Sequence, residues 1–373
     1  MTRRPAGRAG MRVVRRAVLV IVALVVGIVG ATAAPAGAHG LGGLTPTNYE
    51  TVLQSVTPRE PGLHVRITDL GTKVELTNTG RREVVVLGYA GEPYLRIGPK
   101  GVFENQRSPA TFLNRSTTIS AAPPKSADAK ATPVWRRVSS GSSARWHDHR
   151  AHFMGGIDPP AVARDPGQRH VVDNFVIPMR VGGTNVEARG QIVYVPPPSP
   201  WPWVIGAVLV AALVFVLSRT RAWRTVFVVA LALLALTEIV HVIGLWDAST
   251  ASFGTKLGES AYSLAGIALA LLGLGWIWRK GAESAVPIVL VATIFLFVAG
   301  GLADVTSLGN SQVPSTFSAG FARVLVMLTL GLGGGLAAAA GFRLRPSAPA
   351  RPPGGRPGRP RRVRPPKAAP VTS

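Results

Sequence analysis

The hydropathy pattern divides the chain into two parts with different spacing of apolar residues. Between residues 39 and 195, short apolar runs alternate with turn signals such as Asn78-Thr79-Gly80 and Gly98-Pro99. From residue 201 onward the apolar runs are much longer. Short runs bounded by Gly and Pro predict β-strands, whereas long uninterrupted runs predict membrane-spanning helices.

The first part is predicted to be an all-β antiparallel sandwich of the Ig-like or cupredoxin-like class. Gly182-Gly183 is predicted to form the turn of a hairpin, and residues 116–132 are predicted to form a long loop. The predicted strands are Leu63–Asp69, Lys73–Asn78, Glu83–Gly88, Tyr94–Ile97, Gly101–Glu104, Val134–Val138, Ala144–His149, Phe175–Val181 and Val186–Val195.

The second part, residues 201–342, is predicted to be an α-helical membrane domain of five transmembrane helices. Each run is long enough to cross a bilayer as a helix of about 20 residues, and tryptophans lie at the ends of several runs, as at a membrane interface. The proline-rich segment 196–200 is expected to act as a stiff linker between the two parts. The five runs are Trp201–Leu217, Val226–Trp246, Tyr262–Trp278, Val286–Ala303 and Ser318–Phe342.

Residues 1–38 have the pattern of a secretory signal peptide. Arginines precede the apolar run Ala17–Gly30, and small residues follow it up to Ala38. A basic segment, a short apolar segment and an A-x-A cleavage site define such peptides. Cleavage before Gly37 or before His39 fits the pattern, and an uncleaved anchor is the alternative. Cleavage before His39 would make it the first residue of the exported chain.

The charge distribution predicts how the chain is oriented. The chain has 41 Lys+Arg against 18 Asp+Glu, a formal net charge of +23. Basic residues gather in segments that alternating spans would place on one side of the membrane, namely 219–224, 279–280 and 343–373. The opposite loops, 247–258 and 304–317, contain only Lys256 as a basic residue. Because basic loops remain in the cytoplasm, we expect a multi-pass plasma-membrane protein with residues 39–195 outside.

The tail, residues 343–373, is expected to be a disordered basic cytoplasmic segment because it is rich in Pro and Arg. Beside a cytoplasmic leaflet, each basic side chain gains about 1 kcal/mol from anionic lipid. Nucleic acid is not an expected partner, since the tail has no aromatic residue on which a base could stack. Gly331 and Gly335 in the last run form a G-x-x-x-G pair, which permits close helix packing within the molecule or across a homo-oligomer.

The chain contains no cysteine, which excludes disulfides, thiolate zinc sites, iron–sulfur clusters and a cysteine nucleophile. It also contains no G-x-S-x-G elbow, phosphate-binding loop, dinucleotide fingerprint or H-E-x-x-H motif. We therefore do not expect the protein to be an enzyme.

Three histidines lie close together at the end of a predicted strand and form the first candidate site. His147 and His149 would point to one face of that strand, and His152 would follow after a bend. Imidazoles without thiolates suit Cu(II), Zn(II) or Ni(II). The alternative is that these are ordinary polar residues, with Asp148 and Arg150 forming an exposed ion pair.

His39 would add to this site if it became the N-terminus, because its amine and imidazole together can chelate one Cu(II). The sequence therefore predicts an extracytoplasmic metal site, with copper as the expected ion. Its expected ligands are His39, His147, His149 and His152.

The order of parts resembles that of exported copper-binding sandwich proteins of the copper-resistance C type, fused to a membrane partner of the D type. The resemblance rests on His39 after Ala38 and on a sandwich followed by helices. It implies copper binding outside the membrane. The Asp-x-His pair of that family has no counterpart, since His149 follows Asp148 directly. The chain is also similar to uncharacterised exported membrane proteins of actinobacteria, in the Gly88–Tyr94 stretch and the Trp-His-Asp-His run, a similarity that implies no activity.

Ionisable residues in the apolar runs form a second candidate site. Glu238 and His241 are spaced i, i+3 and share a helix face, while Asp304 and Arg323 lie near the outer ends of later runs. An ionisable group inside a span costs at least about 2.5–3.5 kcal/mol, so it usually faces a partner or a cavity. We expect these four side chains to meet beneath the sandwich, either as an ion path or as an ion pair that fixes helix packing.

The function that follows is extracytoplasmic metal binding, with copper handling or uptake as the expected role. The alternative is a cell-envelope interaction or scaffold protein whose histidines carry no metal.

Overall fold

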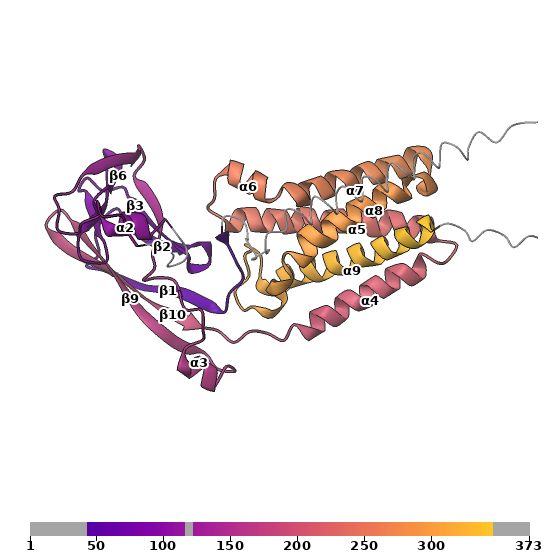
Figure 1. Cartoon of the computed structure of the whole chain (residues 1–373), viewed down its shortest axis with the longest axis horizontal. Helices are drawn as coiled ribbons and strands as arrows, with labels where there is room; N and C mark the ends of the chain where they lie inside the picture. Colours follow the sequence, from indigo (N-terminus) through magenta and orange to yellow (C-terminus); the bar gives the residue numbers. More distant parts are fainter. Residues whose placement is uncertain (1–42, 116–121, 346–373) are drawn as a thin grey trace, which may run out of the picture.

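The computed structural model describes residues 43–115 and 122–345. Two parts lie end to end (Figure 1): a β-rich part from Tyr49 to Tyr194, and a bundle of apolar helices from Trp201 to Leu344 that points away from it. The predicted signal segment, His39 and the tail from residue 346 lie outside the described residues.

The β-rich part contains two sheets whose strand pairings are antiparallel. The larger sheet has the order β1 (Tyr49–Thr57), β10 (Thr184–Tyr194), β9 (His170–Val181), β4 (Val84–Leu87), β5 (Pro93–Gly98), β6 (Gly101–Asn105) and β7 (Trp135–Ser139). The smaller sheet has the order β2 (Leu63–Thr68), β3 (Lys73–Asn78) and β8 (Ser143–His147). Connections contain the 3₁₀ turn η2 (Asp69–Gly71) and the short helices α2 (Pro109–Leu113) and α3 (Pro160–Arg164).

Every predicted apolar run of this part contains a strand, and the Gly182-Gly183 hairpin prediction is confirmed, since Val181 pairs with Thr184 across it. Gly182 has φ +61°, a conformation that glycine adopts without strain. Some strand ends differ from the prediction: β8 ends at His147 rather than at His149, and β9 begins at His170 rather than at Phe175. In addition, β1 was not predicted. β1 is an edge strand, and its side chains are all exposed or half-buried. Because it has no fully buried face, its sequence does not need the apolar alternation from which the other strands were predicted.

The two sheets share one hydrophobic core. Alternate residues of β9, such as Phe175 and Ile177, point into it, as expected for a sheet with one buried face. Val74 and Leu76 of β3 enter the same core from the smaller sheet. Gly190 of β10 lies under the ring of Phe175, where an added Cβ would come within 2.3 Å of Cζ. Because Gly190 and Phe175 are paired across β10 and β9, the inward position of this ring depends on an absent side chain at Gly190.

The helical part contains four helices that are long and apolar enough to cross a membrane. These are α5 (Trp223–Ala248), α7 (Ala261–Lys280), α8 (Ala282–Leu296) continued by the π-helical segment η3 (Phe297–Leu302), and α9 (Ala319–Leu344). The remaining helices are α4 (Trp201–Leu217), α6 (Phe253–Glu259) and the 3₁₀ turn η4 (Val305–Gly309). The sequence predicted five spans; α4 is apolar but shorter than the other four.

The short helix α4 packs along α9 through two glycines (Figure 1). A Cβ on Gly331 would lie 2.7 Å from Cβ of Val210, and a Cβ on Gly335 would lie 2.7 Å from the carbonyl oxygen of Ala211. The G-x-x-x-G pair therefore serves a helix contact within the molecule, the first of the two uses that the sequence indicated.

The β-rich part is joined to the helical bundle by hydrogen bonds of Asp69, the first residue of η2. The Asp69 carboxylate accepts from the backbone N–H of Thr250 at 2.9 Å and from its hydroxyl at 2.7 Å. Lys73 pairs with the same carboxylate at 2.6 Å. Thr47 also forms a bridge with Gln312 of the bundle. One turn of the smaller sheet is thus bonded directly to the loop after α5.

Candidate functional site

His147, the last residue of β8, has one ring nitrogen bonded and one free. Its Nδ1 lies 2.5 Å from the carbonyl oxygen of Thr72. Because a carbonyl oxygen only accepts, Nδ1 carries the proton and Nε2 carries the lone pair. Nε2 is buried and has no hydrogen-bond partner among the described residues. The lone pair of His147 is thus held in the orientation that a metal ligand needs, with a backbone carbonyl on the opposite nitrogen.

His149 and His152 lie against His147 and form with it the histidine cluster (His147, His149 and His152). The ring centroid of His147 lies 4.9 Å from that of His149 and 5.4 Å from that of His152. Strand periodicity predicted that His147 and His149 would meet. The cause in the structure is different, because the strand ends at His147 and a turn brings the other two rings back.

A buried ion pair builds this turn. The Asp148 carboxylate accepts from Nε and a terminal nitrogen of Arg150, each at 2.8 Å, and from Nε1 of Trp146 at 2.9 Å. The Asp148 side chain is 0% exposed and that of Arg150 is 18% exposed. The exposed Asp148–Arg150 pair considered from the sequence is therefore formed, but inside the protein. A two-bond Arg–carboxylate contact fixes direction as well as distance, so it holds the backbone that carries the cluster.

The Gly88–Tyr94 stretch supplies the wall beside this turn. The Tyr89 hydroxyl accepts from the backbone N–H of His149 at 3.1 Å and bonds to Oδ1 of Asn114. The Arg150 guanidinium lies 4.9 Å from the centroid of the Tyr89 ring. The two sequence stretches that the resemblance singled out are thus in direct contact.

Burial keeps two of the imidazoles uncharged. Burial, together with the neighbouring His147 and His149 rings, lowers the pKa of His152 to about 4. Burial also lowers the pKa of His147, although the Thr72 carbonyl opposes this effect. Both rings are therefore neutral at pH 7, which is the state in which imidazole binds metal.

A cavity of about 290 Å³ opens beside His152. Its wall includes the segment Thr45–Thr47, which lies a few residues after His39 in the sequence, together with Tyr49 and Leu70. The Tyr49 ring stacks on Phe153 at 3.7 Å between centroids. The chain from the N-terminus therefore reaches the β-rich part at the cavity that contains His152.

The histidine cluster does not yet form a complete ligand shell. Within residues 43–115 and 122–345, no group of three or more His, Asp or Glu side chains has the arrangement needed to hold a metal ion. The predicted ligand His39 lies outside these residues.

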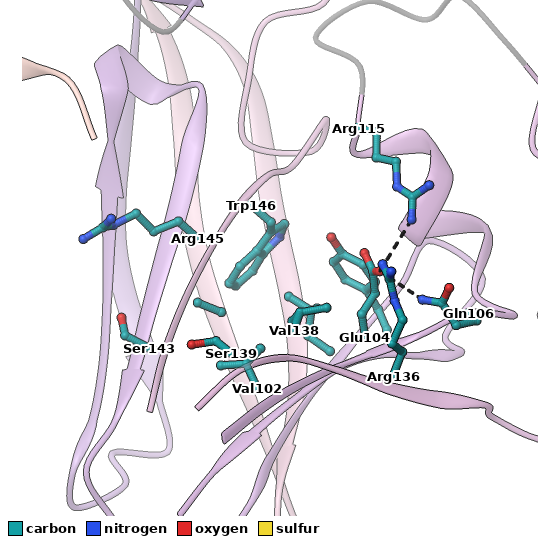
Figure 2. Close-up of a pocket in the computed structure, with 13 residues that line it drawn as sticks. Val102, Glu104, Gln106, Arg115, Arg136, Val138, Ser139, Ser143, Arg145 and Trp146 are labelled. Atoms are coloured by element: carbon teal, nitrogen blue, oxygen red, sulfur yellow. Dashed lines mark hydrogen bonds and ion pairs between the residues drawn. The ribbon is translucent and has the colours of Figure 1, made fainter. Parts of the chain in front are cut away.

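A larger cavity, of about 550 Å³, lies between the edge strands β7 and β8 (Figure 2). Arg115 and Arg136 converge on Glu104 at 3.5 Å and 3.1 Å, and Trp146 lines the wall farther in. None of the three histidines of the histidine cluster lines this cavity. Trp146 lies between this cavity and the histidine cluster. It lines the cavity, and its indole N–H donates to Asp148, which lies next to His147 and His149 in the sequence.

The structure brings three of the four predicted membrane residues close together. His241 Nε2 lies 3.0 Å from Oδ2 of Asp304, and Glu238 interacts electrostatically with both side chains. The expected meeting with Arg323 does not occur. Its guanidinium instead donates to the carbonyl oxygens of Ser307 and Asn310, at 3.1 Å and 2.6 Å, because these loop carbonyls lie directly over the start of α9.

Sequence reasoning did not predict the contact between Asp69 and Thr250, which joins the two parts. Asp69 and Leu70 both have positive φ, 52° and 53°, which is unusual for residues other than glycine. This bend presents Asp69 to Thr250 and places Thr72, two residues after Leu70, against His147. Asp69-Leu70-Gly71 is a turn signal between two predicted strands, but neither Asp69 nor Leu70 is Gly or Asn, so the sequence did not indicate their left-handed conformation.

Comparison of the chain with known protein families, curated proteins and solved structures finds no match.

Proposed function

We propose that the protein binds a metal ion at the histidine cluster of an extracytoplasmic β-rich part, with copper as the expected ion. The observation that carries this proposal is the buried, unbonded Nε2 of His147, whose ring touches two further imidazoles. A buried polar atom without a partner is rare in folded proteins, and a bound metal ion would supply the partner that this nitrogen lacks.

The spacing of the rings is compatible with a shared ion. Metal–nitrogen bonds of about 2.0–2.1 Å place the centroids of two imidazoles on one metal roughly 4.5–5.5 Å apart. The centroid separations of 4.9 Å and 5.4 Å fall in this range. Binding then needs a rotation of His149 or His152 about its side-chain bonds, because the described conformation is not a complete shell.

Copper is favoured by the donor set. The chain offers nitrogen donors and no thiolate, which disfavours a structural zinc site of the finger type. The N-terminal amine and imidazole of His39 would complete a tetragonal Cu(II) site after cleavage. Thr45, which follows His39 by six positions in the sequence, lines the His152 cavity.

The proposed architecture is an Ig-like or cupredoxin-like sandwich outside the membrane, five spans including α4, and a cytoplasmic basic tail at anionic lipid. Arg221 follows α4, Arg279 lies at the end of α7 and Arg343 lies at the end of α9. These helix ends lie at the end of the bundle that points away from the β-rich part (Figure 1). Under the positive-inside rule that end is cytoplasmic. Because the chain has no cysteine, single-cysteine variants S140C and T220C test this directly with an impermeant maleimide on intact cells. Labelling of S140C alone supports the orientation, and labelling of T220C alone reverses it.

Copper titration of the full-length protein in detergent tests the metal proposal. We expect the H147A/H149A double variant to lose at least tenfold in Cu(II) affinity, whereas H64A, which removes an exposed histidine of β2, should bind as the wild type does. Equal affinities in all three proteins would contradict the proposal. N-terminal sequencing of the exported chain tests His39 separately, because a chain that begins at Gly37 cannot form the amine chelate.

A second candidate is a cell-envelope interaction or scaffold protein without metal. The cavity of about 550 Å³ between β7 and β8 favours it, because arginines at positions 115, 136 and 145 line an opening at two sheet edges. Such a site suits an acidic peptide or glycan. Retention of envelope partners by H147A/H149A and their loss in R115A/R136A would support this function.

A further inference from the structure

Glu238 is a carboxyl group enclosed in the middle of the helical bundle. Its side chain lies on α5 and the residue is 0% exposed. Neither carboxyl oxygen has a hydrogen-bond partner among the described residues. Buried carboxylates are normally paired or hydrogen-bonded, so helix packing alone does not account for an acid at this position.

The neighbouring helix leaves room for this carboxyl. Gly300 lies in the π-helical segment η3, and an added Cβ there would lie 2.0 Å from Oε2 of Glu238. Single π-helical turns inside α-helices are rare and occur frequently at functional sites. The wide turn and the missing side chain together form a pocket fitted to the end of Glu238.

The polar groups around Glu238 are two hydroxyls, one imidazole and a second carboxyl. The hydroxyls of Ser263 and Thr329 lie on neighbouring helices, and His241 lies one turn along α5. His241 is itself bonded to Asp304. The guanidinium of Arg323 bonds to loop carbonyls instead. No guanidinium or ammonium group bonds to the Glu238 carboxyl among the described residues, and an unpaired carboxylate is costly in a bundle that excludes water.

We propose that Glu238 is a proton-binding site of the membrane domain, which exchanges its proton with the water beneath the β-rich part through His241 and Asp304.

The geometry provides a route for this proton. His241 shares a face of α5 with Glu238, and its Nε2 lies 3.0 Å from Asp304. Asp304 is 17% exposed and follows η3 at the end of the bundle that faces the β-rich part. In the proposed route, a side-chain rotation of Glu238 brings its carboxyl to the imidazole, which takes its proton and releases a proton from Nε2 to the Asp304 carboxylate. Each transfer conserves charge and needs no other reactant.

This site is independent of the histidine cluster, so it stands or fails separately from copper binding. Infrared spectroscopy of the full-length protein in lipid nanodiscs tests it. At pH 7 we expect the C=O band of a protonated carboxylic acid in the wild type and its absence in E238Q. E283Q is the matched control, since Glu283 is an exposed glutamate at the start of α8, and it should keep the band.

Labelling with [δ-¹³C]glutamate tests the assignment without a variant. It should shift the C=O band in the unchanged wild-type chain, whether or not E238Q folds. A wild-type spectrum without a protonated glutamate band, or one that E238Q leaves unaltered, overturns the proposal.

Transfer into D₂O tests the route. The proton of Glu238 should exchange at least tenfold more slowly in D304N than in the wild type. The same exchange rate in both proteins would refute the path through His241 and Asp304.

Discussion

The two buried polar sites differ in where their partners come from. At the histidine cluster, Asp148 bonds to Trp146 and Arg150, each two residues away in the sequence. In the bundle, Glu238 faces Gly300, and His241 bonds to Asp304, across more than sixty positions. The ion pair of the first site lies within one short segment, although Thr72 and Tyr89 bond to the histidines from other strands and loops, whereas the second site exists only when the helices are assembled.

This difference affects how each site responds to a substitution. The turn after β8 has a carboxylate with every oxygen bonded, so removing one partner leaves buried charge behind. The carboxyl of Glu238 has unbonded oxygens already, so changing its surroundings alters protonation more than it alters hydrogen bonding. The following predictions, from the largest expected effect to the smallest, test this contrast.

Substitution D148A should destabilise the β-rich part by about 3–5 kcal/mol, because it strands the buried Arg150 guanidinium. Urea unfolding of the full chain, followed by the circular dichroism of the strands, measures this. E187A is the matched control, since Glu187 and Arg189 form an ion pair of the same spacing whose side chains are 40% and 56% exposed. It should cost at most about 1 kcal/mol. Equal losses would show that the buried pair has no special role.

Acid should weaken the β-rich part through His152. The pKa of this buried ring is about 4 in the folded protein, against about 6.5 in an unfolded chain. The unfolded state therefore takes up the proton first as the pH falls. Stability that is complete above pH 6.5 should fall by about 3 kcal/mol as the pH approaches 4 and then level off.

Urea unfolding at a series of pH values measures this loss. The H152F variant should show a markedly flatter dependence between pH 6.5 and 4, whatever its stability at neutral pH. The same acid-induced loss in H152F would assign the effect to other groups.

Substitution G300A should disturb the bundle, since its methyl group would overlap the Glu238 carboxyl. We expect a loss of about 1–3 kcal/mol from overpacking, measured as thermal stability in detergent. G275A is the matched control, because a Cβ at Gly275 of α7 meets nothing within 4 Å and alanine favours helix. If G300A is as stable as G275A, the pocket around Glu238 is wider than the structure indicates.

Sequence reasoning reached the elements of this fold because each element has its own apolar period. Strands such as β3 and the long helices follow from runs of residues that lie next to one another in the chain. It also brought His147 and His149 together, although it assumed a strand where the chain turns. Features that depend on assembly were not predicted: the contact of Asp69 with Thr250, the pairing of Arg323 with loop carbonyls, and the half-buried edge strand β1.

The smallest effect is expected at the junction of the two regions. T250V removes the hydroxyl bond to Asp69 but keeps the backbone N–H bond and the shape of the side chain. The loss should be about 1 kcal/mol, and it should be local, because the cores on either side do not contain this residue. Hydrogen exchange should become faster in residues 69–73 and 249–252, whereas β9, β10 and α9 should exchange as before.

T255V is the control for this junction. Thr255 lies exposed on α6, and its hydroxyl bonds to the hydroxyl of Ser252. It should leave the exchange of residues 69–73 unchanged. Faster exchange throughout the β-rich part in T250V would mean that the two regions fold as one unit. Thr72, whose carbonyl oxygen bonds to the His147 ring, lies within residues 69–73. That result would therefore link the orientation of the histidine cluster to the membrane helices.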